Sequence, residues 1–112
     1  MSNEMTVTFP GGKQVCAGYK EFEIMTDQAT ESGGEGLAPE PFDLFLASLA
    51  TCAGFYVLSF CQKRGLSTKD IAITQRWERD PESRRVTTIG IHVTTPGNFP
   101  EKYHKALERS IH

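Results

Sequence analysis

The chain has 112 residues, of which 38% are hydrophobic and 23% are charged, and its formal net charge is -2. This is ordinary composition for a small globular protein, so we expect one domain over residues 1–112. So small a negative charge gives no electrostatic reason to expect nucleic acid or an anionic membrane as a partner.

The N-terminal segment and the cysteines predict a cytoplasmic protein. Residues 1–9 contain neither the basic region nor the apolar core of a signal peptide. Three cysteines, an odd number without paired spacing, argue against a disulfide framework and favour reduced thiols. The cysteines and histidines show no zinc-type spacing, so we expect no metal and no cofactor.

Three short antiparallel strands are predicted at the start of the chain. Thr6 to Phe9 and Gln14 to Ala17 flank Pro10-Gly11-Gly12, a strong turn signal, and a third strand is expected from Phe22 to Met25. Candidates for the buried face of this meander include three side chains: Tyr19, Phe22 and Ile24.

The segment from Asp27 to Pro39 is rich in glycine, has no apolar period and is predicted to be a loop. A glycine-rich loop before a helix can bind phosphate, but neither GxxxxGK[ST] nor GxGxxG is present. Pro39-Glu40-Pro41 also removes amide donors and adds negative charge there, so we reject a phosphate site in this loop.

One long helix is predicted between Pro39 and Gly65, and it is almost wholly apolar. At ~1.5 Å per residue it would be about 36 Å long, whereas a globule of this chain length is only about 34 Å across. One subunit cannot wrap such a rod, so a second copy is the favoured cover. The small residues Ala47, Ala50 and Gly54 would let two helix backbones approach closely.

Two alternatives for this helix remain open. It could be the central helix of a monomer, packed on one sheet. It could also span a membrane, although Asp43, Ser48, Thr51 and Ser59 interrupt the apolar run and the rest of the chain has soluble character.

A β-hairpin and a second helix are predicted after the long helix. From Asp70 to Glu78 the side chains follow a two-residue alternation, which places Ile71, Ile73, Gln75 and Trp77 on one face. Arg84 to Thr94 alternates in the same way, and Asp80-Pro81-Glu82-Ser83 between the two segments is predicted to be the hairpin turn. Pro100 opens a helix with Tyr103, Ala106, Leu107, Ser110 and Ile111 at helical spacing.

Any chemistry is expected to centre on Cys52. Ser48, Tyr56 and Ser59 lie four residues before it, four after it and seven after it, so a narrow polar strip follows an otherwise apolar helix. Such a strip suggests a cleft or a site, because buried polar groups are costly unless paired. The alternative is an inert buried cysteine among hydroxyls that bond back to the helix.

The motif around this cysteine resembles the signature of the OsmC/Ohr family, the osmotically inducible and organic-hydroperoxide-resistance proteins. The resemblance is carried by Gly33-Gly34, by Ala38-Pro39-Glu40-Pro41 and by Leu44 to Cys52, and it extends through Gln62-Lys63-Arg64-Gly65, the hairpin and the last helix. It implies an α+β fold with N-terminal antiparallel strands, a long central helix, a β-hairpin and a C-terminal helix in an intertwined homodimer. It also implies that Cys52 is the peroxidatic thiol.

The sequence departs from the peroxidase members of that family at three points. The resemblance implies a resolving cysteine just after the last helix, and the sequence ends before that segment. It implies a glutamate ten residues before Cys52, where Phe42 stands, and an arginine in the N-terminal strands, where none is found. Lys13 and Lys20 are the cations of that region that could substitute.

Two functions therefore remain as hypotheses. In the first, the protein is a thiol-dependent enzyme that reduces organic hydroperoxides through Cys52, supported by Lys13, Lys20, Ser48 and Tyr56, with an external thiol as reductant. In the second, a non-catalytic dimer binds a small apolar ligand at the subunit interface, with Cys52 in one wall.

Overall fold

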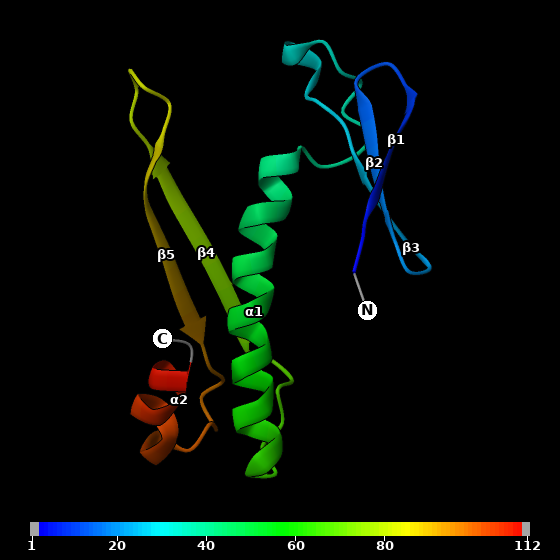
Figure 1. Ribbon diagram of the computed structural model, residues 1–112. Coiled ribbons are helices and arrows are strands. Elements are labelled where there is room, and N and C mark those ends of the chain that lie inside the picture. Colours follow the sequence, from blue (N-terminus) through cyan, green and yellow to red (C-terminus); the bar gives the residue numbers. More distant parts are fainter. Residues whose placement is uncertain (1–2, 111–112) are drawn as a thin grey trace. The chain divides into compact units, whose positions relative to one another are not determined.

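The computed structural model describes residues 3–110, which group into two compact units, residues 3–47 and residues 48–110. The described residues form antiparallel strands and helices, which confirms the predicted α+β class (Figure 1). The long helix, α1 (Pro41–Lys63), begins in the first unit and continues through the second. Its bounds lie within two residues of those expected from the flanking prolines and Gly65.

The first unit contains a three-stranded antiparallel sheet in the order β1-β2-β3. The strands are β1 (Thr6–Gly11), β2 (Gln14–Tyr19) and β3 (Phe22–Thr26), as the turn signals predicted. Gly12 in the first turn and Lys20 in the second adopt left-handed backbone conformations, with φ of 57° and 55°. Tight reversals of this kind commonly need such a residue.

The predicted buried face of this sheet is wrong. Phe22 is 67% exposed and Ile24 is 37% exposed, whereas Cys16, on the opposite face, is buried. Strand register explains the difference, because Tyr19 pairs with Phe22 and Ala17 with Ile24, so these side chains share one face. Tyr19 on the same face is half-buried, so this face is only partly covered within the first unit, and alternation alone could not predict how far each side is covered.

The loop after β3 is organised around a buried carboxylate. Asp27 is 1% exposed, and its two carboxylate oxygens accept hydrogen bonds from the backbone N–H of Gln28 (2.7 Å) and of Leu37 (3.1 Å). Its own N–H donates to the carbonyl of Pro39 at 3.0 Å. The glycine-rich loop, with one 3₁₀ turn (Thr30–Ser32), thus closes on an internal carboxylate instead of a bound anion.

Asp27→Asn is expected to destabilise the protein in a pH-dependent way. The N–H groups of Leu37 and then Gln28 hold the pKa of the Asp27 carboxyl below its usual value. The ionised Asp27 therefore contributes its full stabilisation above the pKa of an unfolded aspartate, ~4. This stabilisation is lost as the pH falls through the lower pKa that Asp27 has in the folded protein. Urea unfolding at pH 7 should show a deficit for Asp27→Asn that narrows toward pH 3. A deficit that does not change with pH would contradict this account.

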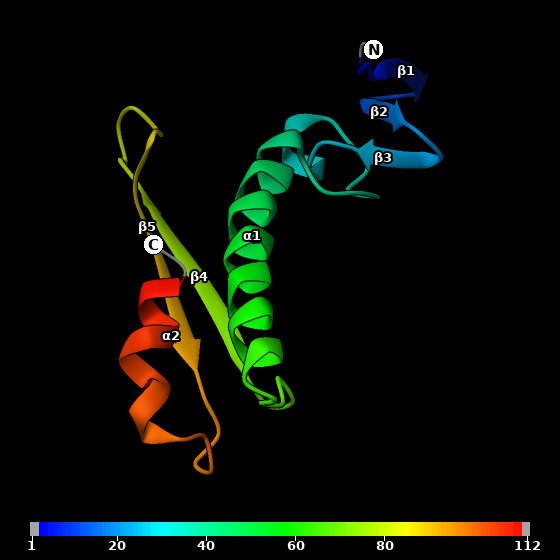
Figure 2. The same ribbon diagram turned by 60° about the horizontal axis from the view of Figure 1, so that its bottom comes forward.

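The second unit contains a hairpin of β4 (Ala72–Arg79) and β5 (Val86–Thr94). Figures 1 and 2 both show the later part of α1 beside it and a short helix, α2, near its open end. The predicted hairpin turn is confirmed, with the Asp80 N–H donating to the Arg85 carbonyl at 2.8 Å. Helix α2 (His104–Ser110) follows a 3₁₀ turn (Glu101–Tyr103), and Ile111 lies outside the described residues.

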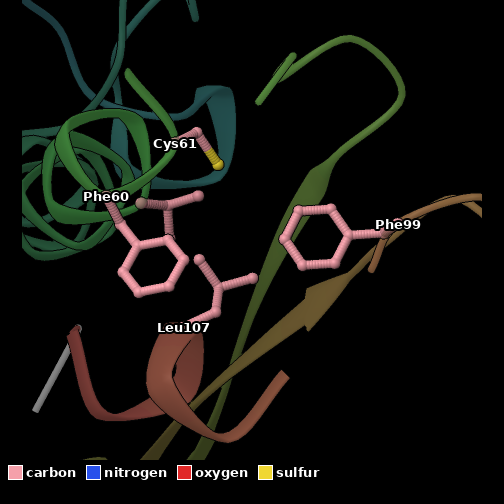
Figure 3. Packing of buried hydrophobic residues seen from close by; sticks show 5 residues of the cluster. Phe60, Cys61, Phe99 and Leu107 are labelled. Atoms are coloured by element: carbon pink, nitrogen blue, oxygen red, sulfur yellow. The ribbon is translucent and has the colours of Figure 1, made fainter. Parts of the chain in front are cut away.

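The core of the second unit lies where α1, α2 and the open end of the hairpin meet. Phe60 of α1, Leu107 of α2 and Phe99 of the preceding loop point toward one another in Figure 3, beside the fully buried Cys61. Val57 completes the buried cluster, and Ile73 and other half-buried apolar side chains pack against it. This core fixes one side of α1 against the hairpin.

Gly54 of the predicted small-residue stripe is half-buried and lies beside β4 of its own chain. A Cβ atom at Gly54 would lie 3.7 Å from the Ile73 Cδ1 atom of β4. That distance is an ordinary van der Waals contact, so the chain's own hairpin does not require glycine there, and contact of the stripe with a second copy stays a prediction. A small-residue pattern predicts a close neighbour but does not say which one.

Candidate functional site

Cys52 lies on the side of α1 that the second unit leaves open. Ser48, Cys52 and Tyr56 are exposed, and Ser59 is half-buried, so the predicted polar strip follows this open side. Thr51 bonds back to its own helix, its hydroxyl donating to the Ser48 carbonyl at 3.3 Å. Cys52 is thus exposed within one chain, while Thr51 bonds back to the helix as the alternative of an inert cysteine expects, and that alternative stays open.

Aromatic side chains flank the thiol. Phe55 is 63% exposed and Tyr56 is 51% exposed, and their rings meet edge to face with centroids 6.1 Å apart. Large aromatic surfaces are rarely left uncovered unless they bind something. The open side of α1 thus combines one thiol, a few hydroxyls and apolar walls, which suits a small molecule with an apolar body and a reactive polar end.

The three cysteines differ sharply in exposure. Within residues 3–110, Cys52 is exposed while Cys16 and Cys61 are buried, and all three are free thiols. Burial raises the pKa of the Cys61 thiol, and the positive charge of Arg64 offsets this only in part. Since the thiolate is the nucleophile, Cys61 is a poor candidate for chemistry.

Arg64, in the motif that ends α1, is a cation near the Cys61 thiol. Its guanidinium carbon lies 3.7 Å from the centroid of the Phe60 ring, and its Nη1 donates to the Phe60 carbonyl at 3.1 Å. Phe60 and Arg64 are four residues apart, and this spacing on a helix predicts that their side chains are neighbours. Arg64 thus covers the end of the core instead of reaching the open side of α1.

The supporting cations proposed for Cys52 lie in the other unit. Lys20 places its Nζ atom 5.2 Å from the Tyr19 ring centroid, and the side chain of Lys13 runs past Gly33. A role for Lys13 or Lys20 beside the thiol would need contacts between the two units, and it stays a prediction. Phe42 stacks loosely with Phe45, their ring centroids 5.7 Å apart, at the position where the family resemblance implies a glutamate.

Helix α1 is long and apolar enough to cross a membrane, and only 28% of its most apolar stretch is buried within the described chain. Length and composition are weak evidence by themselves, because the core helix of a soluble protein meets the same criteria. Over residues 3–110, no group of three or more His, Cys, Asp or Glu side chains is arranged to hold a metal ion.

Comparison with known proteins decides the family. The family described as OsmC-like protein matches residues 33–112 of this chain. The chain belongs to the OsmC-like protein family. The match includes the whole of α1 and therefore Cys52 and its polar strip. No curated protein matches the chain.

Two solved structures show the same OsmC-like fold. One is a candidate osmotic stress induced and detoxification response protein from Psychrobacter arcticus 273-4, with a TM-score of 0.81 and 23% identity. The other is an organic hydroperoxide resistance protein, OsmC, from Legionella pneumophila, with a TM-score of 0.57 and 20% identity. Each comparison covers 99% of this chain and 82% of the other. At these identities the likeness establishes the fold alone.

Proposed function

We propose that this OsmC-like protein is a cytoplasmic, thiol-dependent redox protein that reduces organic hydroperoxides through Cys52. The observation that carries the proposal is the exposure of Cys52 beside Phe55 and Tyr56, while Cys16 and Cys61 are buried. Membership of the family and the fold shared with an organic hydroperoxide resistance protein support it.

The reaction begins with attack of the Cys52 thiolate on one oxygen of the hydroperoxide ROOH. The O–O bond breaks, the sulfur becomes a sulfenic acid, and the alcohol ROH leaves after taking up a proton. An external dithiol then reduces the enzyme: its first thiol condenses with the sulfenic acid and releases water, and its second thiol displaces Cys52 as the free thiol. The dithiol leaves oxidised to a disulfide.

The surroundings of Cys52 favour organic substrates over hydrogen peroxide. Phe55 and Tyr56 offer apolar surface that an alkyl or aryl group would cover, and hydrogen peroxide has no such group. The N-terminal strands contain no arginine, and Phe42 could not hold one as a glutamate would, so electrostatic support for the thiolate is weaker than in a complete peroxidase site. Loss of comparable preorganised charge costs on the order of 10² in rate, so we expect slow turnover.

Cys52 is expected to be the cysteine that reacts first. Cys61 is fully buried with a raised thiol pKa, so in the native protein it should label with iodoacetamide far more slowly than Cys52. Cumene hydroperoxide followed by dimedone should place the sulfenic acid adduct on Cys52. Peptide mass spectrometry locates both labels. Equal, slow labelling of the two cysteines that accelerates only in denaturant would show that Cys52 is inert.

The second candidate function is binding of a small apolar ligand without catalysis. A groove of about 320 Å³ runs between α1 and the start of β4, with a mainly apolar lining of Gly54, Val57, Leu58, Thr68, Ile71 and Ile73. A non-catalytic homodimer could bind a small apolar ligand at such a groove if it adjoins the subunit interface. The labelling experiment separates the two candidates, because only the first needs a reactive Cys52.

We also propose that the protein works as an intertwined homodimer. Leu49, Phe55, Tyr56 and Leu58 of α1 are 37–63% exposed within one chain, which is an unusual cost for a soluble helix. The Nε2 atom of Gln75, on the inner face of β4, is buried without a hydrogen-bond partner among the described residues. A second copy would cover most of this apolar surface, with Cys52 and its substrate in a cleft between the two chains, and could supply the missing acceptor.

A further inference from the structure

The outer face of the β4–β5 hairpin carries a polar cluster that the proposed chemistry does not use. Successive side chains of a strand point to opposite faces, so Thr74 and Arg76 lie on the face opposite Ile73, which packs against α1. The strand register places His92 across from Thr74 and Gly90 across from Arg76. Four positions thus form one block on the side of the hairpin away from the core.

Gly90 leaves a hollow among these four positions, because it has no side chain to fill the space above its backbone. The hairpin hollow, lined by Thr74, Arg76, Gly90, Ile91 and His92, has a volume of about 170 Å³. Within residues 3–110, no hydrogen bond, ion pair or ring contact engages the side chain of Arg76 or His92. Both donor side chains are therefore available to a ligand.

We propose that the hairpin hollow binds a single phosphate-sized oxyanion. The Arg76 guanidinium can offer two parallel N–H donors, and the Thr74 hydroxyl and His92 imidazole can each offer one from the other sides of the hollow. A tetrahedral anion has enough oxygens to meet all of these donors, whereas a carboxylate has two. The volume exceeds that of a single water several-fold, which leaves room for such an anion.

The neighbouring carboxylate limits the strength of the site. Glu78 lies two residues beyond Arg76 on the same face, opposite Thr88, and does not line the hollow. Its negative charge competes for the Arg76 guanidinium and repels an anion. Binding should therefore be weak, in about the millimolar range for one exposed arginine with two further donors, and Glu78→Gln should tighten it.

The test is titration of ¹⁵N-labelled protein with inorganic phosphate, at constant ionic strength maintained with chloride. We expect saturable shifts confined to the amides of β4 and β5 around the hollow. Arg76→Gln should weaken binding about tenfold or more, as expected for loss of a charge-assisted hydrogen bond. Gly90→Val should abolish binding while leaving every charge in place, and valine suits a strand.

The controls make the outcome decisive. Arg85→Gln removes the same charge from an exposed position of the same hairpin, outside the hollow, and should leave the affinity unchanged. Equal losses for Arg76→Gln and Arg85→Gln, or full affinity in Gly90→Val, would overturn the site. Acetate that binds as tightly as phosphate would overturn the assignment of a tetrahedral anion.

Discussion

Replacing Leu107 with alanine is expected to lower the free energy of unfolding by about 2–5 kcal/mol. Leu107 is 2% exposed and is the buried residue that α2 contributes to the core, between Phe60 and Phe99 (Figure 3). Removing its outer carbons leaves a cavity that two aromatic rings cannot readily fill. Urea unfolding followed by circular dichroism, at one fixed protein concentration, measures the loss.

The matched control for this change is Leu37→Ala. Leu37 is 67% exposed, so the same truncation there should alter stability by about 0.5 kcal/mol or less. Losses of equal size at the two positions would mean that α2 is not fixed on the core as described.

Light scattering is expected to give twice the chain mass of 12.4 kDa down to low micromolar concentrations. Phe55→Glu should convert the protein toward the mass of one chain, because Phe55 is the most exposed large apolar side chain in the α1 segment of the second unit, at 63%. A carboxylate at that position could not be buried against a second apolar surface without a large desolvation cost.

Gln62→Glu serves as the control for charge alone. Gln62 is an exposed position near the end of the same helix, so the added carboxylate should leave the mass unchanged. A folded wild-type protein with the mass of one chain would refute the homodimer, and would leave the exposed side of α1 without its proposed cover.

Most elements could be predicted from the sequence because their boundaries depend on local chemistry. Pro10-Gly11-Gly12, the prolines before α1, Gly65 and the Asp80 turn set limits that each act within a few residues. The family signature around Cys52 then predicted the fold, which the comparisons confirm. Local signals of this kind need no knowledge of distant contacts.

The features that were missed depend on contacts between distant segments. Phe22 and Ile24 were assigned to a covered face because alternation identifies two faces but not which one is covered. The position of Gly54 beside Ile73 was missed because Ile73 lies 19 positions along the chain. The buried Asp27 was read as an ordinary loop residue, since its N–H partner at Leu37 becomes apparent only when the loop closes.

The site shows the same division. The common side of the helix shared by Ser48, Cys52 and Tyr56 follows from helical periodicity, whereas their exposure within one chain was not predicted. The hairpin hollow at Gly90 was not predicted, because it depends on the cross-strand register that brings Arg76 and His92 beside Gly90. Support of the thiol by Lys13 or Lys20 depends on contacts between the two units and stays a prediction.

The most direct test of the central proposal is the consumption of cumene hydroperoxide by wild type and by Cys52→Ser, with a small dithiol such as dithiothreitol in excess. We expect slow turnover by wild type in proportion to protein concentration, arrest after one turnover per Cys52 without dithiol, and no consumption above background by Cys52→Ser. Cys61→Ala, which alters a buried thiol, should retain the activity of wild type. Equal rates for wild type and Cys52→Ser would contradict the proposal.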